Sequence, residues 1–471
     1  MTKRCMAGLL AMLLPVWAMA TGVSAERLEL SLADAVALAL RDNRHVRSAY
    51  LQRVAQKFDL QVARERFQPR LILNARSQVN RDQGDRSRQH GLEPQASVLS
   101  PWGTRVNLGW SHQLNQANRA DDLYNEGVDF NLVQPLLRDA GPEVGMAPVR
   151  LAELDERVHR LNLRASLTHN VTQVALAYRG LLHSQEQLRL AREAWQRSQQ
   201  LLAVNRALIA AGRLAEFDIV QAEADDASQE LGVEQARNQL QGSREALLQL
   251  LALAPDTMID ASDDLAVVEP DLTLANAQAL ARQQRPDYLI QQIAARQVEL
   301  NLLLANNQRL WDLALVGGAS QVRERWQGAR TQRRWDSYAG LQLEVPLGDS
   351  TARQRQVHAE VAVADQRLRS EQASAQLALE VTAALRETAT QWRQLNLAGR
   401  AAQLAIRKLD IEQQKLQAGR SSNFQVLSFE SDRRAAEHAQ LAARIAYLNG
   451  QSRLDEVLGL TLQRWEISVH D

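Results

Sequence analysis

The chain has 471 residues, of which 4% are aromatic, and its 55 basic side chains balance 55 acidic ones. The scarcity of aromatics, together with long stretches rich in Ala, Leu, Gln, Arg and Glu, argues against ordinary globular domains and is typical of long helices and coiled coils. The balanced charge lacks the basic excess of a nucleic-acid-binding protein, so no nucleic-acid partner is expected.

Residues 1–25 have the features of a secretory signal peptide. Lys3 and Arg4 precede an apolar run over 6–20, which at about 15 residues is short for a membrane-spanning helix. Small residues at 23–25 fit a cleavage site, and an N-terminal anchor helix is the alternative. Cleavage there removes two basic and no acidic residues, which leaves 53 basic and 55 acidic side chains and a net charge of −2.

The only cysteine, Cys5, lies inside the predicted signal, so the mature chain would have no disulfide and no thiolate metal site. Because Cys5 precedes the apolar run, lipid attachment at this cysteine is not expected. No later segment has the roughly 18 consecutive apolar residues of a membrane-spanning helix. An exported chain of this kind is either soluble or crosses the outer membrane as a β-barrel.

The first half is predicted to span residues 26–254, with helices before and after a strand region. Its elements are, in order, a helix from Ser31 to about Phe67, strands within about 70–135, a helix from about Val149 to Ala211, a tight turn at 211–216 and a helix over about 217–254. Gly and Pro in the polar stretch 80–94 predict a loop between the strands. The long helix would measure roughly 90 Å, which is typical of a coiled-coil rod.

An acidic linker at 255–271 separates the two halves, and the second half, residues 272–460, repeats the same order. Its elements are a helix from Thr273, two strands within about 311–346, a helix over about 350–418, a tight turn at 418–423, a helix to about Gly459 and then a tail at 461–471. The longest of these helices would measure roughly 100 Å.

The two turns are the clearest part of the repeat, with AGRLAEFDIV at 211–220 and AGRSSNFQVL at 418–427. A Gly just past a helix end can adopt the left-handed conformation that closes the helix. Residues 30–35 also resemble 272–277, a spacing of 242 that falls to 207 at the turns. The first half is therefore 35 residues longer, mostly in its strands. This predicts one extra short hairpin, which either joins a barrel or folds over its mouth.

The last strands of the two halves alternate in phase between apolar and polar residues. The apolar positions are Val128, Phe130 and Leu132 in the first half and Ala339, Leu341 and Leu343 in the second. An apolar outer face, a polar inner face and five of the mature chain's eight tryptophans in these regions fit a transmembrane β-barrel. A small soluble β-domain is the alternative. About four to six strands are too few to close a barrel, so several chains would have to share one.

These features resemble the TolC family of trimeric outer-membrane efflux ducts. The resemblance rests on the order and duplication of the elements, on the two turns and on three motifs: Leu30-Ser31-Leu32-Ala33-Asp34-Ala35, Gln134-Pro135-Leu136-Leu137 and Val345-Pro346-Leu347-Gly348. It implies a mainly α fold with β, built from two internal repeats. Three chains would form a twelve-stranded outer-membrane β-barrel, continued by a long periplasmic α-helical barrel.

The resemblance also assigns roles to residues at the turns. Asp218 matches a position that places an acid near the periplasmic constriction. Gln425 and Ser428 occupy positions where some members carry acids, so this constriction would be polar but less cation-selective. The turn residues that would meet a periplasmic adaptor are Gly212, Arg213, Gly419 and Arg420. The alternative interpretations are an acid at a helix N-terminus and solvated charges near helix C-termini, both favoured by the helix dipole.

The function implied is a passive outer-membrane exit duct of a tripartite efflux or type I secretion system. Its partners would be two further copies of the chain, a periplasmic adaptor (membrane fusion protein), an inner-membrane pump of the RND, ABC or MFS type, and outer-membrane lipid. The nine histidines show no metal-ligand spacing and no catalytic motif is present, so no enzyme activity, metal or cofactor is expected. A periplasmic adaptor and a coiled-coil scaffold without a pore are the alternatives.

Overall fold

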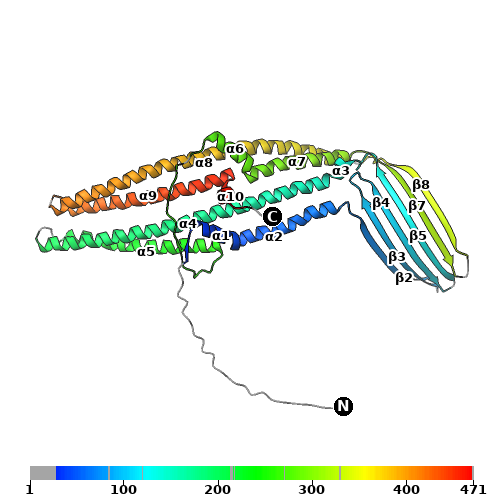
Figure 1. The fold of residues 1–471 in the computed structure, drawn as a ribbon, viewed down its shortest axis with the longest axis horizontal. Coiled ribbons are helices and arrows are strands. Elements are labelled where there is room, and N and C mark those ends of the chain that lie inside the picture. The colour runs from blue at the N-terminus through cyan, green and yellow to red at the C-terminus, as the bar shows by residue number, and fades with distance from the viewer. Residues whose placement is uncertain are drawn as a thin grey trace, which may run out of the picture.

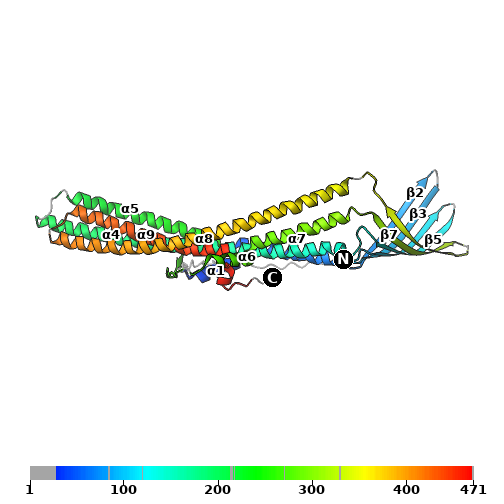
Figure 2. The same cartoon turned by 90° about the horizontal axis from the view of Figure 1, so that it is seen from above.

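The structure, a computed structural model, describes residues 28–82, 85–118, 120–212, 216, 218–269, 271–327, 330–348, 350–418 and 420–468. The predicted signal peptide at 1–25 lies outside these residues. The described part is elongated, with a β-sheet at one end and two helix turns at the other (Figure 1, Figure 2). Helices run along the length between these ends.

Two antiparallel helical hairpins make up most of the molecule. The first joins α4 (Ala147–Ala210) to α5 (Asp218–Leu251), and the second joins α8 (Thr351–Gln417) to α9 (Asn423–Leu458). With 64 residues in α4 and 67 in α8, each long helix measures about 100 Å at 1.5 Å per residue. Their sequences are dominated by Ala, Leu, Gln, Glu and Arg, which are the strongest helix formers. The two predicted rods are therefore confirmed.

The helices that lead into the sheet are each broken, whereas the sequence predicted one continuous helix from Ser31 and another from Thr273. The observed pairs are α1 (Leu32–Asp42) with α2 (Arg44–Glu65), and α6 (Leu274–Gln284) with α7 (Pro286–Asn307). At the first break, Asn43 is extended and its side-chain oxygen accepts from the N–H groups of the next helix, as an N-cap does. At the second, Pro286 disfavours a helical Arg285, which is extended.

Six antiparallel strands form one sheet in the order β2-β3-β4-β5-β7-β8. They are β2 (Arg70–Asp82), β3 (Asp85–Leu99), β4 (Arg105–Ala117), β5 (Ala120–Pro135), β7 (Asp312–Trp326) and β8 (Gln332–Glu344). The predicted loop over 80–94 is wrong, because its described residues continue β2 and β3, which pair along their full length. The extra hairpin is therefore β2–β3. It is long rather than short, and it joins the sheet.

The register of the sheet places the predicted apolar residues of its strands on one face. Leu132 of β5 lies opposite Gly317 of β7, which lies opposite Ala339 of β8. Directly opposite residues of paired strands point to the same face, and successive residues alternate between faces. Phe130 and Leu341 therefore share this face too. The predicted phase of the alternation in the two halves is confirmed.

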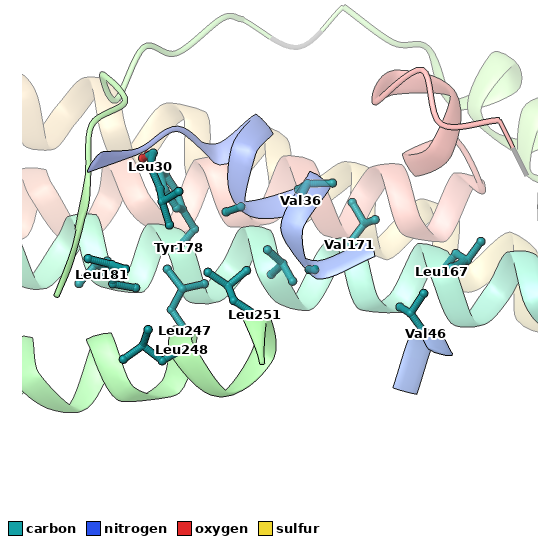
Figure 3. Close-up of a cluster of buried hydrophobic side chains, with 14 of the residues drawn as sticks. Leu30, Val36, Val46, Leu167, Val171, Tyr178, Leu181, Leu247, Leu248 and Leu251 are labelled. Carbon is teal, nitrogen blue, oxygen red and sulfur yellow. The ribbon is translucent and has the colours of Figure 1, made fainter. Parts of the chain in front are cut away.

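The largest apolar cluster lies where the first hairpin meets the N-terminal elements (Figure 3). Its members include Leu30, Val36 and Val46 from the N-terminal segment, Leu167, Val171, Tyr178 and Leu181 from α4, and Leu247, Leu248 and Leu251 from α5. A short parallel pair of strands, β1 (Leu28–Leu30) and β6 (Ile259–Ala261), closes one side. The short helices α3 (Pro142–Gly145) and α10 (Thr461–Arg464) pack against α4.

Tyr178 ties three segments together inside this cluster, where it is 0% exposed. Its hydroxyl donates to the Leu30 carbonyl oxygen at 2.8 Å. The same hydroxyl oxygen accepts from the backbone N–H groups of Ser262 and Asp263, each at 3.2 Å. One side chain thus holds the start of α1 and the segment after β6 against α4.

We expect Tyr178→Phe to lower the free energy of unfolding by about 1–3 kcal/mol, because it removes a buried hydroxyl that serves the Leu30 carbonyl and two partly buried N–H groups. The measurement is denaturant unfolding of the detergent-solubilised protein. The matched control is Tyr50→Phe on α2, where the side chain is exposed and the change should stay within about 0.5 kcal/mol. Equal effects of the two substitutions would contradict the role of the Tyr178 hydroxyl.

Candidate functional site

The turn between α4 and α5 and the turn between α8 and α9 lie at the same end of the molecule, away from the sheet (Figure 1, Figure 2). All the residues that the sequence singled out belong to these two turns or to the first residues of the helices that follow. We call this end the tip region. It is the candidate functional site because segments about 200 residues apart in the chain meet there.

The first turn closes α4 as the sequence predicted. Gly212 has a φ of +67°, and its N–H donates to the Ile209 carbonyl oxygen at 2.9 Å. Glycine adopts this left-handed conformation without the steric cost that a side chain brings. Asp218 is the first residue of α5, where the helix dipole favours an acid; only its backbone is described. Arg213 lies outside the described residues.

The second turn is held by side chains as well as by the backbone. The hydroxyl of Ser421 donates to Glu412 at 2.6 Å, and the Lys415 ammonium donates to the same carboxylate at 3.0 Å. These two hydrogen bonds hold the pKa of Glu412 below its usual value, so the carboxylate is ionised at neutral pH. Ser422 caps α9, because its hydroxyl oxygen accepts from the Gln425 N–H at 3.3 Å.

The remaining predicted residues have different surroundings. Gln425 is half-buried in the first turn of α9, whereas Ser428 and Arg420 are exposed. Gly419 lies outside the described residues. Asp218 and Gln425 begin corresponding helices of the two hairpins, so the fold brings the predicted constriction residues to one end of the molecule. Their role in a constriction stays a prediction.

Close to the tips, polar side chains connect the two hairpins. Arg197 of α4 donates from Nε to Glu430 of α9 at 2.5 Å, and its Nη2 lies 3.8 Å from Glu437. About two turns nearer the tip region, the Asn205 amide donates to the Asn423 side-chain oxygen at 3.0 Å. We call these five residues the inter-hairpin cluster. They belong only to α4 and α9, one helix from each hairpin.

The inter-hairpin cluster is shielded from solvent. Asn205 is 0% exposed, Asn423 is 3% exposed and Glu430 is 4% exposed. Removing one partner of a buried ion pair leaves an uncompensated charge and is strongly destabilising. A small apolar group beside it, formed by Leu409, Leu416 and Val426, excludes water from the same contact. The hairpins are therefore joined near their ends by few, strong contacts.

The sequence missed this cluster because its partners are far apart in the chain. Glu430 follows its turn at the same offset as Glu223 follows the first turn, and the two are indistinguishable in sequence. Glu223 is exposed and pairs with Arg206 of its own hairpin at 3.3 Å, whereas Glu430 is buried against Arg197. Only the packing of α9 on α4 separates these two environments.

A second connection between the hairpins lies halfway along α4. Arg179 donates to the Leu448 carbonyl oxygen at 2.5 Å and to the Ser452 hydroxyl at 2.9 Å, both on α9. Burial lowers the pKa of Arg179 to about 10, and Asp455 opposes this shift, so the guanidinium is still charged at neutral pH. Burial raises the pKa of Asp455, while its 2.7 Å hydrogen bonds from Arg464 act in the opposite direction.

In the part of the chain that the structure describes, no group of three or more His, Cys, Asp or Glu residues is placed to hold a metal ion. The helices among the described residues include none that is both long and apolar enough to cross a membrane. Among the described residues of the tip region and the inter-hairpin cluster, the polar groups bind one another, and none of these contacts pairs a nucleophile with a histidine base. Their arrangement can hold two hairpins together or release them.

No protein-family model matches the sequence, and no curated protein matches it. Solved structures do match. The outer membrane protein VceC from Vibrio cholerae is 16% identical, with a TM-score of 0.67, over 91% of this chain and 96% of that one. The Campylobacter jejuni CmeC outer membrane channel is 15% identical, with a TM-score of 0.68, over 91% and 86%. The open state of the Neisseria gonorrhoeae MtrE outer membrane channel is 16% identical, with a TM-score of 0.67, over 91% and 89%.

Each of the three likenesses covers 91% of this chain. At identities of 15–16% it shows a common fold. This chain therefore has the mainly helical fold with a β-sheet that bacterial outer-membrane channel proteins have. The trimer, the twelve-stranded barrel and the internal repeats that the resemblance to the TolC family implies stay predictions.

Proposed function

We propose that the chain is one of three identical subunits of an outer-membrane exit duct, which exports substrates from the periplasm in a tripartite efflux or type I secretion system. The observation that carries this proposal is the two-faced sheet at the end of long helical hairpins. Leu71 is 77% exposed and Leu341 is 70% exposed, and both belong to the apolar face that crosses the sheet. An apolar surface of this extent needs a partner or a membrane.

Lipid is the partner that fits this face. The strands alternate between apolar residues on one side and polar residues on the other, which is the pattern of an outer-membrane wall around water. Trp102 and Trp311 lie at the helix-side ends of strands and are 62% and 56% exposed. Trp335 is 69% exposed on β8, nearer the opposite end of the sheet. Exposed tryptophans near both ends of the strands match the aromatic girdles of outer-membrane β-barrels.

One chain cannot enclose a pore, because six strands are fewer than the roughly eight of the smallest barrels. Three chains, arranged around one axis, would place the polar faces inward and continue the wall through the helical hairpins into the periplasm. Substrates would then pass through water without chemical change. A periplasmic adaptor and an inner-membrane pump would supply substrate and energy from the tip end.

The tip region would act as the gate of this duct. Its opening requires the ends of the two hairpins to separate, and the inter-hairpin cluster resists that movement. Adaptor contacts at Gly212, Arg213, Gly419 and Arg420 could compensate the loss of these bonds.

Asp218, Gln425 and Ser428 would line the constriction of the duct, as the resemblance implies. Because only Asp218 of these three carries a charge, the constriction would be weakly cation-selective.

Fractionation of cells that produce the full chain tests the function. A duct remains with the outer membrane until detergent is added and then migrates as a trimer. Deletion of its gene should lower the export of at least one substrate and restoration should recover it. A soluble periplasmic protein of monomer size would instead support a coiled-coil scaffold and contradict the duct.

We expect Arg197→Ala to lower the free energy of unfolding by about 3–5 kcal/mol, because Glu430 would stay buried without its partner. In planar bilayers the same variant should show a higher single-channel conductance than the unchanged protein, since the hairpin tips are less firmly joined. The matched control is Arg189→Ala on the same helix, where the side chain is 54% exposed and the ion pairs contribute about 0–1 kcal/mol. Arg189→Ala should change neither stability nor conductance by a comparable amount.

We expect Asp218→Ala to raise conductance or to reduce selectivity for cations, because it removes a ring of three carboxylates from the constriction of the trimer. The reversal potential under a KCl gradient measures selectivity. Asp256→Ala serves as the control, since Asp256 is an exposed acid in the segment after α5. If conductance and reversal potential are both unchanged in Asp218→Ala, Asp218 does not belong to the gate.

A further inference from the structure

The outer edges of the sheet are the strands β2 and β8. Within the described chain β2 pairs only with β3, and β8 pairs only with β7. Each edge therefore presents a row of backbone N–H and C=O groups that the sheet itself does not satisfy. In a bilayer every such group must find a partner, so lipid-exposed sheet edges do not occur.

The apolar band reaches both edges of the sheet, with Ser337 as a polar position within it on β8. Across the sheet one row runs from Leu71 through Ala96, Leu108, Phe130 and Ala319 to Ser337, with each residue opposite the next. Leu73 and Ala75 continue the band along β2, and Leu341 and Leu343 continue it along β8. The β2–β3 hairpin thus carries the same lipid-facing surface as the other four strands. A hairpin folded over the mouth of a pore would not contact lipid, so it would not need an apolar surface of this kind.

The opposite, polar face is the crowded one, as the inner side of a curved wall must be. A Cβ added to Gly109 would lie 2.3 Å from the Asp129 side chain, and one added to Gly318 would lie 2.7 Å from the Tyr338 ring. Gly109 and Gly318 both point to the polar face. Tyr338 crosses Gly318 and donates to Asn131 of β5 at 2.8 Å.

The polar face is also hollowed over the extra hairpin. A depression of about 480 Å³ lies over β2, β3 and β4, lined by residues that include Asn74, Arg76, Gln89, Glu93 and Gln113. These five side chains belong to the polar face in the observed register. The extra hairpin therefore contributes both a lipid-facing band and a water-facing surface, which is what a wall strand needs.

Strand directions permit the two edges to meet. β2 leaves the end of α2 and runs away from the helices, whereas β8 runs back toward them and leads into α8. Because the sheet has an even number of alternating strands, β8 of one copy and β2 of another are antiparallel when their helices lie on the same side (Figure 1). An edge-to-edge contact continues the existing pattern without a parallel pair.

We propose that β8 of one chain pairs with β2 of a second copy, so that the three-chain duct closes with eighteen strands. This inference rests on the proposed trimer and deepens it, because it names the strand edges that join the subunits. The resemblance to the TolC family implies twelve strands, or four per chain, for which β4 would be the edge. Barrel diameter grows roughly linearly with strand number, so the opening through the sheet would be about 1.5 times as wide.

Disulfide trapping in the full chain tests the inference, since the only native cysteine, Cys5, lies in the predicted signal. One cysteine replaces Leu71, Leu73 or Ala75 in β2, and a second replaces Ala339, Leu341 or Leu343 in β8, in every combination. Facing positions of neighbouring antiparallel strands have Cβ atoms about 4.5–5.5 Å apart, close enough for a small shift to reach the roughly 3.5–4.5 Å of a disulfide. We expect at least one combination to give covalently linked trimers on non-reducing gels from oxidised outer membranes.

A parallel series puts the first cysteine at Val106, Leu108 or Trp110 in β4 and keeps the same β8 positions. Linked chains in this series, without links from β2, would overturn the eighteen-stranded closure and leave the trimeric duct intact. Absence of links in both series, with a monomer in detergent, would overturn the duct as well. A trimer without any β2 link also counts against the proposal. The pair Leu108→Cys with Phe130→Cys, which face each other within one chain, is the control and should link no chains together.

Discussion

The strict two-residue period of the β-strands is the constraint on which the rest of the molecule depends. A slip of one residue in any pairing would move that strand's apolar side chains to the polar face. The β4–β5 pairing shifts register only between Asn115 and Ala117, far from the helices, and the apolar band stays on one face from β2 to β8. In the proposed duct, the polar face would then line the water-filled pore, and the helices that continue from the strand ends would extend the same wall.

The contacts that hold the helical part together differ from those that hold the sheet together. Its long helices are rich in Ala and Leu and poor in aromatic residues, so their contacts are thin over most of the length. The largest apolar cluster lies in the middle, where the N-terminal elements cover α4 and α5. The two hairpins meet through buried polar contacts at Arg179, at the level of this cluster, and again at Arg197, closer to the tip region. Such contacts are strong individually but few, which lets the hairpin ends separate as units.

The features that could be predicted from the sequence are those that repeat with one period over many residues. The two rods and the common face of β5 and β8 belong to this kind. The segment 80–94 was misread because its residues are polar on both faces and include Gly91 and Pro94, which signal turns in isolation. The pairing of β3 with β4 outweighs the preference of Gly91 and Pro94 for a turn. Pro286 is a visible break signal, whereas Asn43 caps the next helix and its amide also donates to the distant Leu250 carbonyl oxygen at 2.7 Å, a contact that the sequence does not reveal.

The contact between Arg197 and Glu430 could not have been found from a single sequence. The residues are 233 positions apart, and neither stands in a recognisable motif. Burial decides its importance, and burial of a helix face depends on which neighbouring helix covers it. The same limit applies to Asn205 and Asn423, which occupy otherwise apolar positions. Polar residues at such positions are a usable signal only once the facing helix is known.

The sheet and the tip region differ in how readily their structure can change. The width of an opening through a hydrogen-bonded sheet is set by the number of strands, and altering it would require breaking a whole ladder of backbone bonds in a medium that cannot replace them. In the proposed duct, the tip region would be closed by side chains that water reaches at their margins, where a partner protein could substitute one polar contact for another. A regulated constriction would then lie at the tips, and the sheet could be wide because the substrate would be selected before it reached the sheet.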